Sequence, residues 1–336
     1  MRKRWTTMKR IQPVVCGLNI AKSIKHHFGG QAPWMEYVVD HPDIDTGDPF
    51  YATMNFEQAV ERADIPILLV GGWYDVFAPQ IMRQSARLSE RDTNVALMMG
   101  PWNHTQVDIQ AEVHKQSYNW IEQHLAKRNV EARSSSVQYF VTGEKAWRYE
   151  ARWPPPTAVL EWYLGRGQRL TTEKDAGEGS SYFVFDPNEP TQTVGGNLLL
   201  LGGGSPDDTV LVARSDIFAF TTEHLENDVE VAGEIIVQLC QSSDDKDVYL
   251  FVRISEVNVN VRSHNVTETY KRLGATQEAQ KLVLHLNGCA HRFTKGCQIQ
   301  LLIAGASFHN MRSIPELRRT LYAMAEEMLP RCCFLW

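Results

Sequence analysis

The sequence predicts a protein of two parts, an α/β half built on a parallel sheet and an all-β half that forms a sandwich. Three observations support this fold class. Up to about residue 150, short continuous apolar runs alternate with segments of helical periodicity. A triple proline, Pro154–Pro156, then interrupts the chain. Beyond it, short β-rich runs are separated by Gly, Asp, Asn and Pro, which places the boundary near Trp153.

The first half contains the elements of a parallel sheet. Residues 66–72 and 95–100 are continuous apolar runs, and the first is typical of a strand buried on both faces. Residues 79–90, between them, show helical periodicity with a proline near the start. Residues 112–128 form a second helical stripe with a charged opposite face, and residues 137–141 form a third strand. This order predicts a parallel sheet with crossover helices.

The second half is predicted to be a β-sandwich, most simply a jelly roll, because many short strands are separated by turn signals. Gly202–Gly204 is followed by Ser-Pro and by no helical pattern, so it predicts a turn between strands and not a phosphate loop. Residues 313–329 show helical periodicity and are predicted to be an amphipathic helix. The predicted strands cover residues 160–164, 182–185, 198–201, 217–221, 229–231, 234–239, 248–257, 281–286 and 298–303.

Two residues of catalytic type follow the first two predicted strands. Asp75 comes directly after Gly71-Gly-Trp-Tyr, and His104 comes directly after Gly100-Pro-Trp-Asn. Because loops at the carboxyl ends of parallel strands converge on one crevice, adjacent strands would bring the two side chains together. A carboxylate that accepts a hydrogen bond from an imidazole fixes its tautomer and stabilises the imidazolium. The residues alone leave open an alternative, in which the aspartate caps a helix and the histidine is an ordinary loop residue.

The segments around these two residues resemble the acid and histidine segments of the cocaine-esterase and X-Pro dipeptidyl-peptidase family of α/β-hydrolases. They are residues 65–77 (IPILLVGGWYDVF) and 98–104 (MMGPWNH). Residues 35–43 are similar to the end of the family's helical cap. Further segments resemble the family's C-terminal jelly roll, which is galactose-binding-like: residues 147–154, 182–187, 213–221, 230–233, 242–244 and 262–267.

The resemblance covers roughly residues 34–308 and implies a division of the chain. In it, residues 1–45 are the remnant of a helical cap, 46–152 the C-terminal half of the α/β-hydrolase domain, 153–310 the jelly-roll domain and 311–336 a divergent tail. It also implies that Asp75 and His104 are the acid and the base of a catalytic triad.

No nucleophile of the family's kind is found in this sequence. The family's serine lies in a Gly-x-Ser-x-Gly elbow, and no serine here has that context; Ser307 follows a Gly-Ala pair but lacks the second glycine. Because the family's serine lies upstream of its acid, we expect the chain to be a fragment. Two hypotheses follow. The chain is a serine hydrolase fragment acting on esters or amides, or it is a catalytically inactive fragment whose sandwich is a structural or carbohydrate-facing binding module.

Four aromatic residues flank the predicted pair, namely Trp73, Tyr74, Phe77 and Trp102. They either line a substrate pocket or pack in the core, and the sequence does not choose between the two. Under the first hypothesis the substrate is a small ester, a β-lactam-type amide or a short X-Pro peptide.

The composition of the chain argues against several other classes of function. A formal net charge of −6 without a basic stripe argues against a nucleic-acid partner, and no apolar run approaches membrane-spanning length. The basic N-terminus is followed by an interrupted apolar run, so no convincing signal peptide is present and a cytoplasmic location is favoured. A possible zinc site would use Cys289, His291 and Cys297, but a fourth ligand is missing. We therefore expect no metal or cofactor. The two cysteines are expected to be buried in strands and the histidine to lie at the surface. The sequence does not decide whether the protein forms a homo-oligomer.

Overall fold

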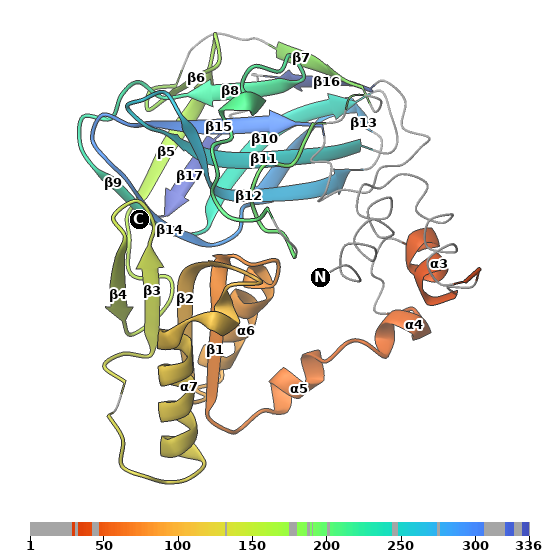
Figure 1. Cartoon of the computed structure of the whole chain (residues 1–336). Coiled ribbons are helices and arrows are strands. Elements are labelled where there is room, and N and C mark those ends of the chain that lie inside the picture. The colour runs from red at the N-terminus through yellow and green to blue at the C-terminus, as the bar shows by residue number, and fades with distance from the viewer. Residues whose placement is uncertain are drawn as a thin grey trace.

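The computed structural model describes most of the chain and divides it into an α/β part and a β-sandwich (Figure 1). The described residues are 29–30, 33–41, 47–131, 133–174, 180–186, 189, 191–199, 202–243, 248–273, 276–305, 320–325 and 331–335. None of the helices within these ranges combines the length and the apolar character needed to cross a membrane.

The α/β part has the strands and helices that the apolar runs predict. They are β1 (Ile67–Tyr74), α6 (Ala78–Glu90), β2 (Val95–Asn103), α7 (Ala111–His124) and β3 (Val137–Val141). A further strand, β4 (Ala146–Glu150), was not predicted. The strands follow the order β1-β2-β3-β4; the first three are parallel, and β4 runs antiparallel to β3 as the return of a hairpin. The parallel sheet with crossover helices is therefore confirmed.

Strand β1 lies at the edge of this sheet. Within the described ranges β2 is its one strand partner, and its first four residues, Ile67–Val70, are only half-buried, whereas Gly71–Tyr74 are buried. The prediction of a strand buried on both faces is thus wrong for the first half of β1. The apolar run specifies a buried strand, but no described strand pairs with the outer edge of β1.

Three short helices, coloured red to orange in Figure 1, precede β1, and the last of them lies beside the α/β part. They are α3 (Pro33–Asp40), α4 (Pro49–Ala52) and α5 (Glu57–Arg62). Asp48 caps α4 by accepting the Phe50 N–H at 2.8 Å, and Pro49 occupies the first turn, where no N–H is needed. Most of the predicted cap remnant at residues 1–45 lies outside the described residues.

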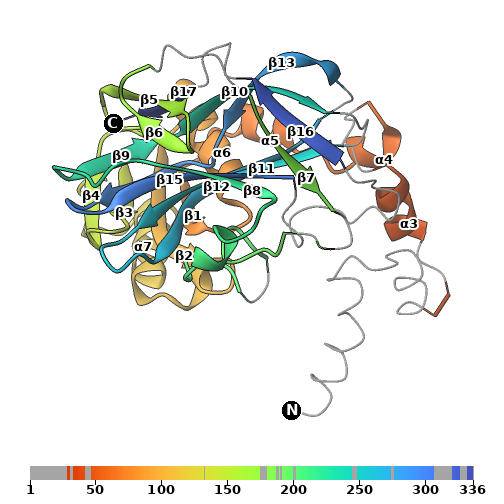
Figure 2. The same ribbon diagram turned by 90° about the horizontal axis from the view of Figure 1, so that it is seen from above.

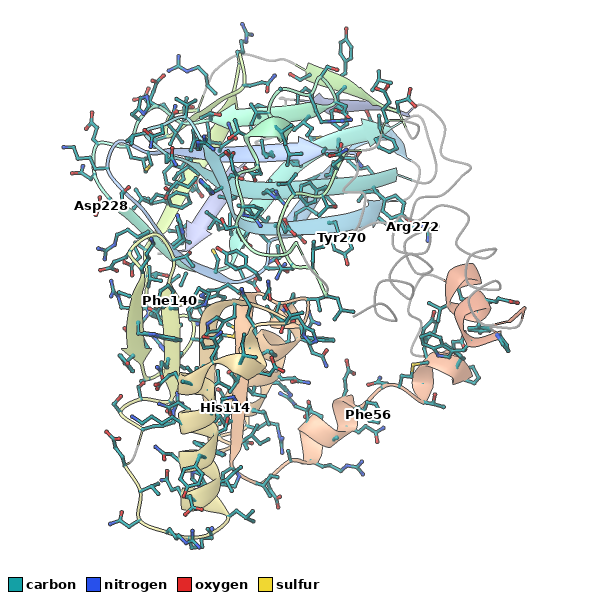
Figure 3. The ribbon with its side chains drawn as sticks, viewed as in Figure 1. Phe56, His114, Phe140, Asp228, Tyr270 and Arg272 are labelled. Atoms are coloured by element: carbon teal, nitrogen blue, oxygen red, sulfur yellow. The ribbon has the colours of Figure 1, made fainter. Side chains whose placement is uncertain are left out.

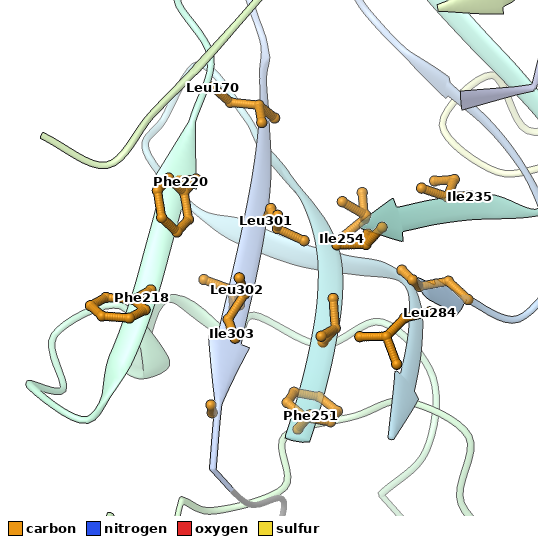
Figure 4. Close-up of a cluster of buried hydrophobic side chains, with 14 of the residues drawn as sticks. Leu170, Phe218, Phe220, Ile235, Phe251, Ile254, Leu284, Leu301, Leu302 and Ile303 are labelled. Carbon is orange, nitrogen blue, oxygen red and sulfur yellow. The ribbon is translucent and has the colours of Figure 1, made fainter. Parts of the chain in front are cut away.

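The second part is a β-sandwich. Its strands are β5 (Val159–Gly165), β6 (Arg169–Thr171), β7 (Ser180–Phe185), β8 (Ile217–Thr221), β9 (Val229–Gly233), β10 (Ile235–Ser243), β11 (Val248–Val257), β12 (Ser263–Leu273), β13 (Thr276–His285), β14 (Cys289–Phe293), β15 (Gln298–Ala304), β16 (Thr320–Ala325) and β17 (Arg331–Leu335). Most join one curled sheet, and β14 pairs with β9. Inward side chains of β8, β10, β11, β13 and β15 form the core, as Figure 4 shows for Phe218, Ile235, Ile254, Leu284 and Leu301.

Two local predictions in this part are wrong. Residues 320–325, inside the predicted helix 313–329, form β16, which pairs with β7 and β10. Pairing with two strands far away in the sequence overrides a local periodicity that favours a helix. Leu198 and Leu199, from the predicted strand 198–201, lie in a loop between two glycine turns, and the rest of that strand falls outside the described residues. Strands β6, β12, β14 and β17 were not predicted. The jelly-roll topology stays a prediction.

The sandwich lies over the carboxyl ends of β1 and β2, which both views show (Figures 1 and 2). Thr142, just after β3, makes a parallel bridge to His291 of β14: its N–H donates to the Ala290 carbonyl, and its carbonyl accepts from the Arg292 N–H, both at 2.9 Å. The two parts are therefore joined by main-chain hydrogen bonds at the edge of the sheet where the predicted site lies.

Candidate active site

Asp75 follows β1 and is held in a tight turn. Its N–H donates to the Gly72 carbonyl at 3.0 Å, and its carboxylate Oδ1 accepts the Phe77 N–H at 2.9 Å. The residue is 5% exposed. A buried carboxylate anchored by a backbone N–H has few orientations available, so its second interaction is directed.

His104 follows β2 and faces this carboxylate. Its Nδ1 lies 3.2 Å from Oδ1 and 3.3 Å from Oδ2 of Asp75. The His104 side chain is 40% exposed, whereas that of Asp75 is 7% exposed. A hydrogen on Nδ1 donates to the carboxylate and leaves the lone pair on Nε2, which is the form that a general base needs. The structure thus brings together the two residues that the strand ends predict.

The four flanking aromatic residues divide into two groups. Phe77 is 45% exposed, and its ring meets the His104 ring edge-on with 5.2 Å between centroids. Trp73, Tyr74 and Trp102 are buried, which favours core packing for these three. Burial raises the pKa of the Tyr74 phenol to about 12. Trp73 Nε1 donates to the carbonyl of Phe140, a β3 residue labelled in Figure 3.

A third segment, which was not predicted, contacts the turn of Asp75. The side-chain amide of Asn197, from the sandwich, donates to the carbonyls of Trp73 at 3.0 Å and of Asp75 at 2.8 Å. The only signal in the sequence is the Gly195-Gly196-Asn197 triplet, which marks a turn but does not say where the turn points.

The predicted surface position of His291 is wrong. His291 is 7% exposed, its Nε2 lies 2.8 Å from Glu256 Oε2, and its Nδ1 lies 2.8 Å from the Thr142 hydroxyl. The reason is that β14 packs against β3 of the other part, so this strand is covered. Cys289 and Cys297 are buried, and burial raises the pKa of the Cys289 thiol to about 12. Within the described ranges, no group of three or more His, Cys, Asp and Glu side chains could hold a metal ion.

A cleft of about 890 Å³ lies elsewhere, on the sandwich beside β5 and β6. Its wall includes Arg166, Arg169, Glu223 and His224, but neither Asp75 nor His104. Trp162, also in the wall, is 5% exposed and offers no open ring face. The hydrogen-bonded pair, and not this cleft, therefore defines the candidate active site.

Two family models match the chain. Residues 129–322, more than half of the chain, match the X-Pro dipeptidyl-peptidase C-terminal non-catalytic domain, and residues 9–106 match the X-Pro dipeptidyl-peptidase (S15 family).

Curated relatives agree with these models. A cocaine esterase from Rhodococcus sp. (strain MB1 Bresler) is 27% identical over 257 residues, which are 68% of this chain and 44% of that protein. A putative serine esterase from Mycobacterium bovis is 22% identical over 324 residues, 82% of this chain and 50% of that protein. The chain therefore spans about half the length of the curated relatives it matches.

Solved structures share the fold. An α-amino acid ester hydrolase superposes with a TM-score of 0.79 at 18% identity, covering 93% of this chain and 62% of that one. An aminopeptidase from a marine-sediment Thaumarchaeota archaeon gives a TM-score of 0.76 at 16% identity, covering 90% of this chain and 59% of that one. A CocE/NonD family hydrolase from Staphylococcus aureus gives a TM-score of 0.70 at 12% identity, covering 91% of this chain and 59% of that one. The chain belongs to the cocaine-esterase and X-Pro dipeptidyl-peptidase family of α/β-hydrolases.

Proposed function

We propose that Asp75 and His104 are the acid and the base of a serine hydrolase centre that cleaves esters or amides by acyl transfer. The observation that carries the proposal is the pair itself, joined at 3.2 Å at the carboxyl ends of adjacent parallel strands. His104 Nε2 would take the proton of a serine hydroxyl and later return it to the leaving group. Asp75 would hold the Nδ1–H tautomer and stabilise the imidazolium.

The nucleophile in this proposal comes from a polypeptide segment other than these 336 residues, because no serine in them lies in a Gly-x-Ser-x-Gly elbow. The outer edge of β1 supports this assignment. A parallel strand paired there would end at the same edge of the sheet as Asp75 and His104, which is where an elbow serine must lie. It would also cover the half-buried residues Ile67–Val70.

The names of the relatives support an acyl substrate. Three of the matched proteins are described as esterases or ester hydrolases, and the family models describe X-Pro dipeptidyl-peptidases. Phe77, exposed beside the His104 ring, is the residue we propose to contact the substrate.

The cleft on the sandwich supports the second candidate, a catalytically inactive chain whose sandwich binds a ligand or has a structural role. Its charged wall favours a polar ligand. The buried ring of Trp162 does not favour a sugar that stacks on an aromatic face. The pair at the strand ends makes the hydrolase the stronger candidate.

A paired assay tests the proposed function. The 336-residue chain should hydrolyse activated esters at background rate, and the variants His104→Ala and Asp75→Asn should not differ from it, because no acyl-enzyme can form. A longer polypeptide, read from the gene upstream of Met1 and containing a Gly-x-Ser-x-Gly elbow, should hydrolyse the same esters and react with a fluorophosphonate probe. There, His104→Ala should lower kcat by about a million-fold.

Two residues outside the site serve as controls for the longer polypeptide. His114, labelled on α7 in Figure 3, and Asp108 are exposed, so His114→Ala and Asp108→Asn should retain full activity. Turnover by the 336-residue chain that depends on His104 would mean that the nucleophile lies within it. Full activity of the longer His104→Ala variant would remove His104 from the mechanism.

A further inference from the structure

Two glycine turns of the sandwich reach the edge of the α/β sheet where the proposed site lies. Gly196 and Gly204 bridge the turns, with N–H to carbonyl distances of 2.7 and 3.0 Å. Gly196 has φ +85°, and a Cβ added there would lie 2.0 Å from the carboxylate Oε1 of Glu268. A Cβ added to Gly203 would lie 3.5 Å from the Cβ of Asn103, the neighbour of His104. Gly196 therefore lets the first turn pack directly against Glu268, and Gly203 of the second turn lies next to the loop of His104.

Asn197, at the end of the first turn, bonds to the main chain around Asp75. The register of β1 with β2 shifts between Gly72 and Tyr74, so Trp73 has no partner residue in β2. The Asn197 amide donates to the carbonyl of Trp73 at 3.0 Å and to that of Asp75 at 2.8 Å. One amide group thus joins the carbonyls on both sides of Tyr74, and it fixes the turn that aims the Asp75 carboxylate.

A buried ion pair holds Asn197 in turn. Its N–H donates at 3.0 Å to Glu268 Oε1, while Glu268 Oε2 accepts two hydrogen bonds from Arg253, at 3.0 and 2.6 Å. Arg253 also donates to Asp208 Oδ2 at 2.9 Å. The side chains of these three charged residues are at most 3% exposed. Charged hydrogen bonds in a low-dielectric core are strong and strongly oriented, so the turn that carries Asn197 is rigid.

We propose that Asn197 is a positioning residue of the hydrolase centre: the sandwich, through this side chain, sets the orientation in which Asp75 receives the Nδ1–H of His104. The proposal rests on the proposed roles of Asp75 and His104. It gives a part in the active site to the region whose family model is described as non-catalytic.

The test reads the tautomer of His104 directly. In the 336-residue chain labelled with ¹⁵N-histidine, at a pH above about 8 where histidine is neutral, ¹⁵N shifts distinguish Nδ1–H from Nε2–H. We expect Nδ1–H in the wild-type chain and a large shift toward Nε2–H in Asp75→Asn. Asn197→Ala and Asn197→Leu should move the tautomer ratio toward Nε2–H by about two- to tenfold, the range set by one or two hydrogen bonds.

A matched control is Asn258→Ala. The Asn258 side chain accepts the N–H groups of Asn260 and Arg262 in an exposed turn of the same sandwich, so its loss should leave the His104 tautomer unchanged. A tautomer shift in Asn258→Ala as large as in Asn197→Ala would point to general loosening of the sandwich and overturn the specific role.

The outcomes separate the two proposals. If Asp75→Asn leaves the tautomer unchanged, the pair itself fails, and with it the proposed function. If Asp75→Asn shifts the tautomer and the Asn197 variants do not, only the positioning role fails. If no Asn197 variant folds, hydrogen exchange in the wild-type chain still tests the positioning role. The Asn197 side-chain amide protons must then exchange with solvent more slowly than those of Asn258. Equal exchange would contradict the proposal.

Discussion

Arg253 is a fully buried charged side chain in the core of the sandwich. It donates to Glu268, to Asp208 and to the Val194 carbonyl, and its guanidinium carbon lies 5.2 Å from the centre of the Phe251 ring. Taking such a charge out of water costs several kcal/mol, which these partners offset. Their loss would leave an uncompensated charge in an apolar core.

Glu268→Gln tests this balance. The substitution keeps the size of the side chain but removes its charge, so we expect the free energy of unfolding to fall by about 3–5 kcal/mol. Urea unfolding followed by far-UV circular dichroism measures it. Glu223→Gln is the control, because Glu223 pairs with Arg169 at the surface and its loss should not shift the transition measurably. Equal transitions for the two variants would show that the buried pair does not stabilise the fold.

Among the elements, β1 combines two properties that are seldom found together. It carries the loop of Asp75, and it exposes an unpaired edge within the described part of the chain. Ile67 N–H donates to Asn94 next to β2, so by alternation the N–H and carbonyl of Leu68 point toward the outer edge. No charged residue occurs between Ile67 and Tyr74, whereas natural edge strands are usually protected by charge or proline.

We therefore propose that the 336-residue chain self-associates through the edge of β1, and Leu68→Lys should suppress it. A lysine at this position can extend its charge into water while its methylenes cover the apolar face. Sedimentation velocity over a range of concentrations measures the effect. Ile109→Lys, at an exposed position outside any strand, is the control and should leave association unchanged. Equal association of the Leu68→Lys and wild-type chains would rule out this edge.

At the scale of the whole molecule, the two parts meet at a polar contact. His291 Nε2 bonds to Glu256, and its Nδ1 bonds to Thr142 of the α/β part. Arg148 of β4 and Arg292 of β14 both pair with Glu144 and Glu230, so charges from both parts alternate across the boundary. Beside it, Ala232 and Ala290 of the sandwich share an apolar cluster with Trp73 and Tyr74, so polar and apolar contacts together hold the sandwich over the strand ends.

The Glu256–His291 pair predicts how acid weakens the fold. Burial alone would raise the pKa of Glu256, but the hydrogen bond and charge of His291, with smaller contributions from Cys297 and His264, outweigh it, so the pKa lies below its ordinary value of 4.5. A group with a lowered native pKa stabilises the fold above its unfolded pKa, and this contribution is lost as the pH falls through the native pKa. Glu256→Gln should therefore destabilise the chain at pH 5.5, and the difference from wild type should shrink below pH about 4.5.

Urea unfolding at several pH values between about 3 and 5.5 checks this expectation. Glu234 forms a matched pair with His285 at the surface, with side chains 56% and 57% exposed, so the effect of Glu234→Gln should be small and nearly constant with pH. A difference for Glu256→Gln that stays constant across this range would contradict the role of Glu256.

The sequence by itself determined the parallel sheet and the two residues at its strand ends, because these follow from local patterns: continuous apolar runs, helical periodicity between them, and one polar residue where each run stops. It also determined the family, through the segments around Asp75 and His104. Only the tertiary structure decided which residues surround the pair. Phe77 is exposed and Trp73, Tyr74 and Trp102 are buried because of what packs against each, which no periodicity records. His291 is buried, residues 320–325 are a strand and Asn197 holds the turn of Asp75 for the same reason: each depends on a partner that lies far away in the chain and is brought close only by folding.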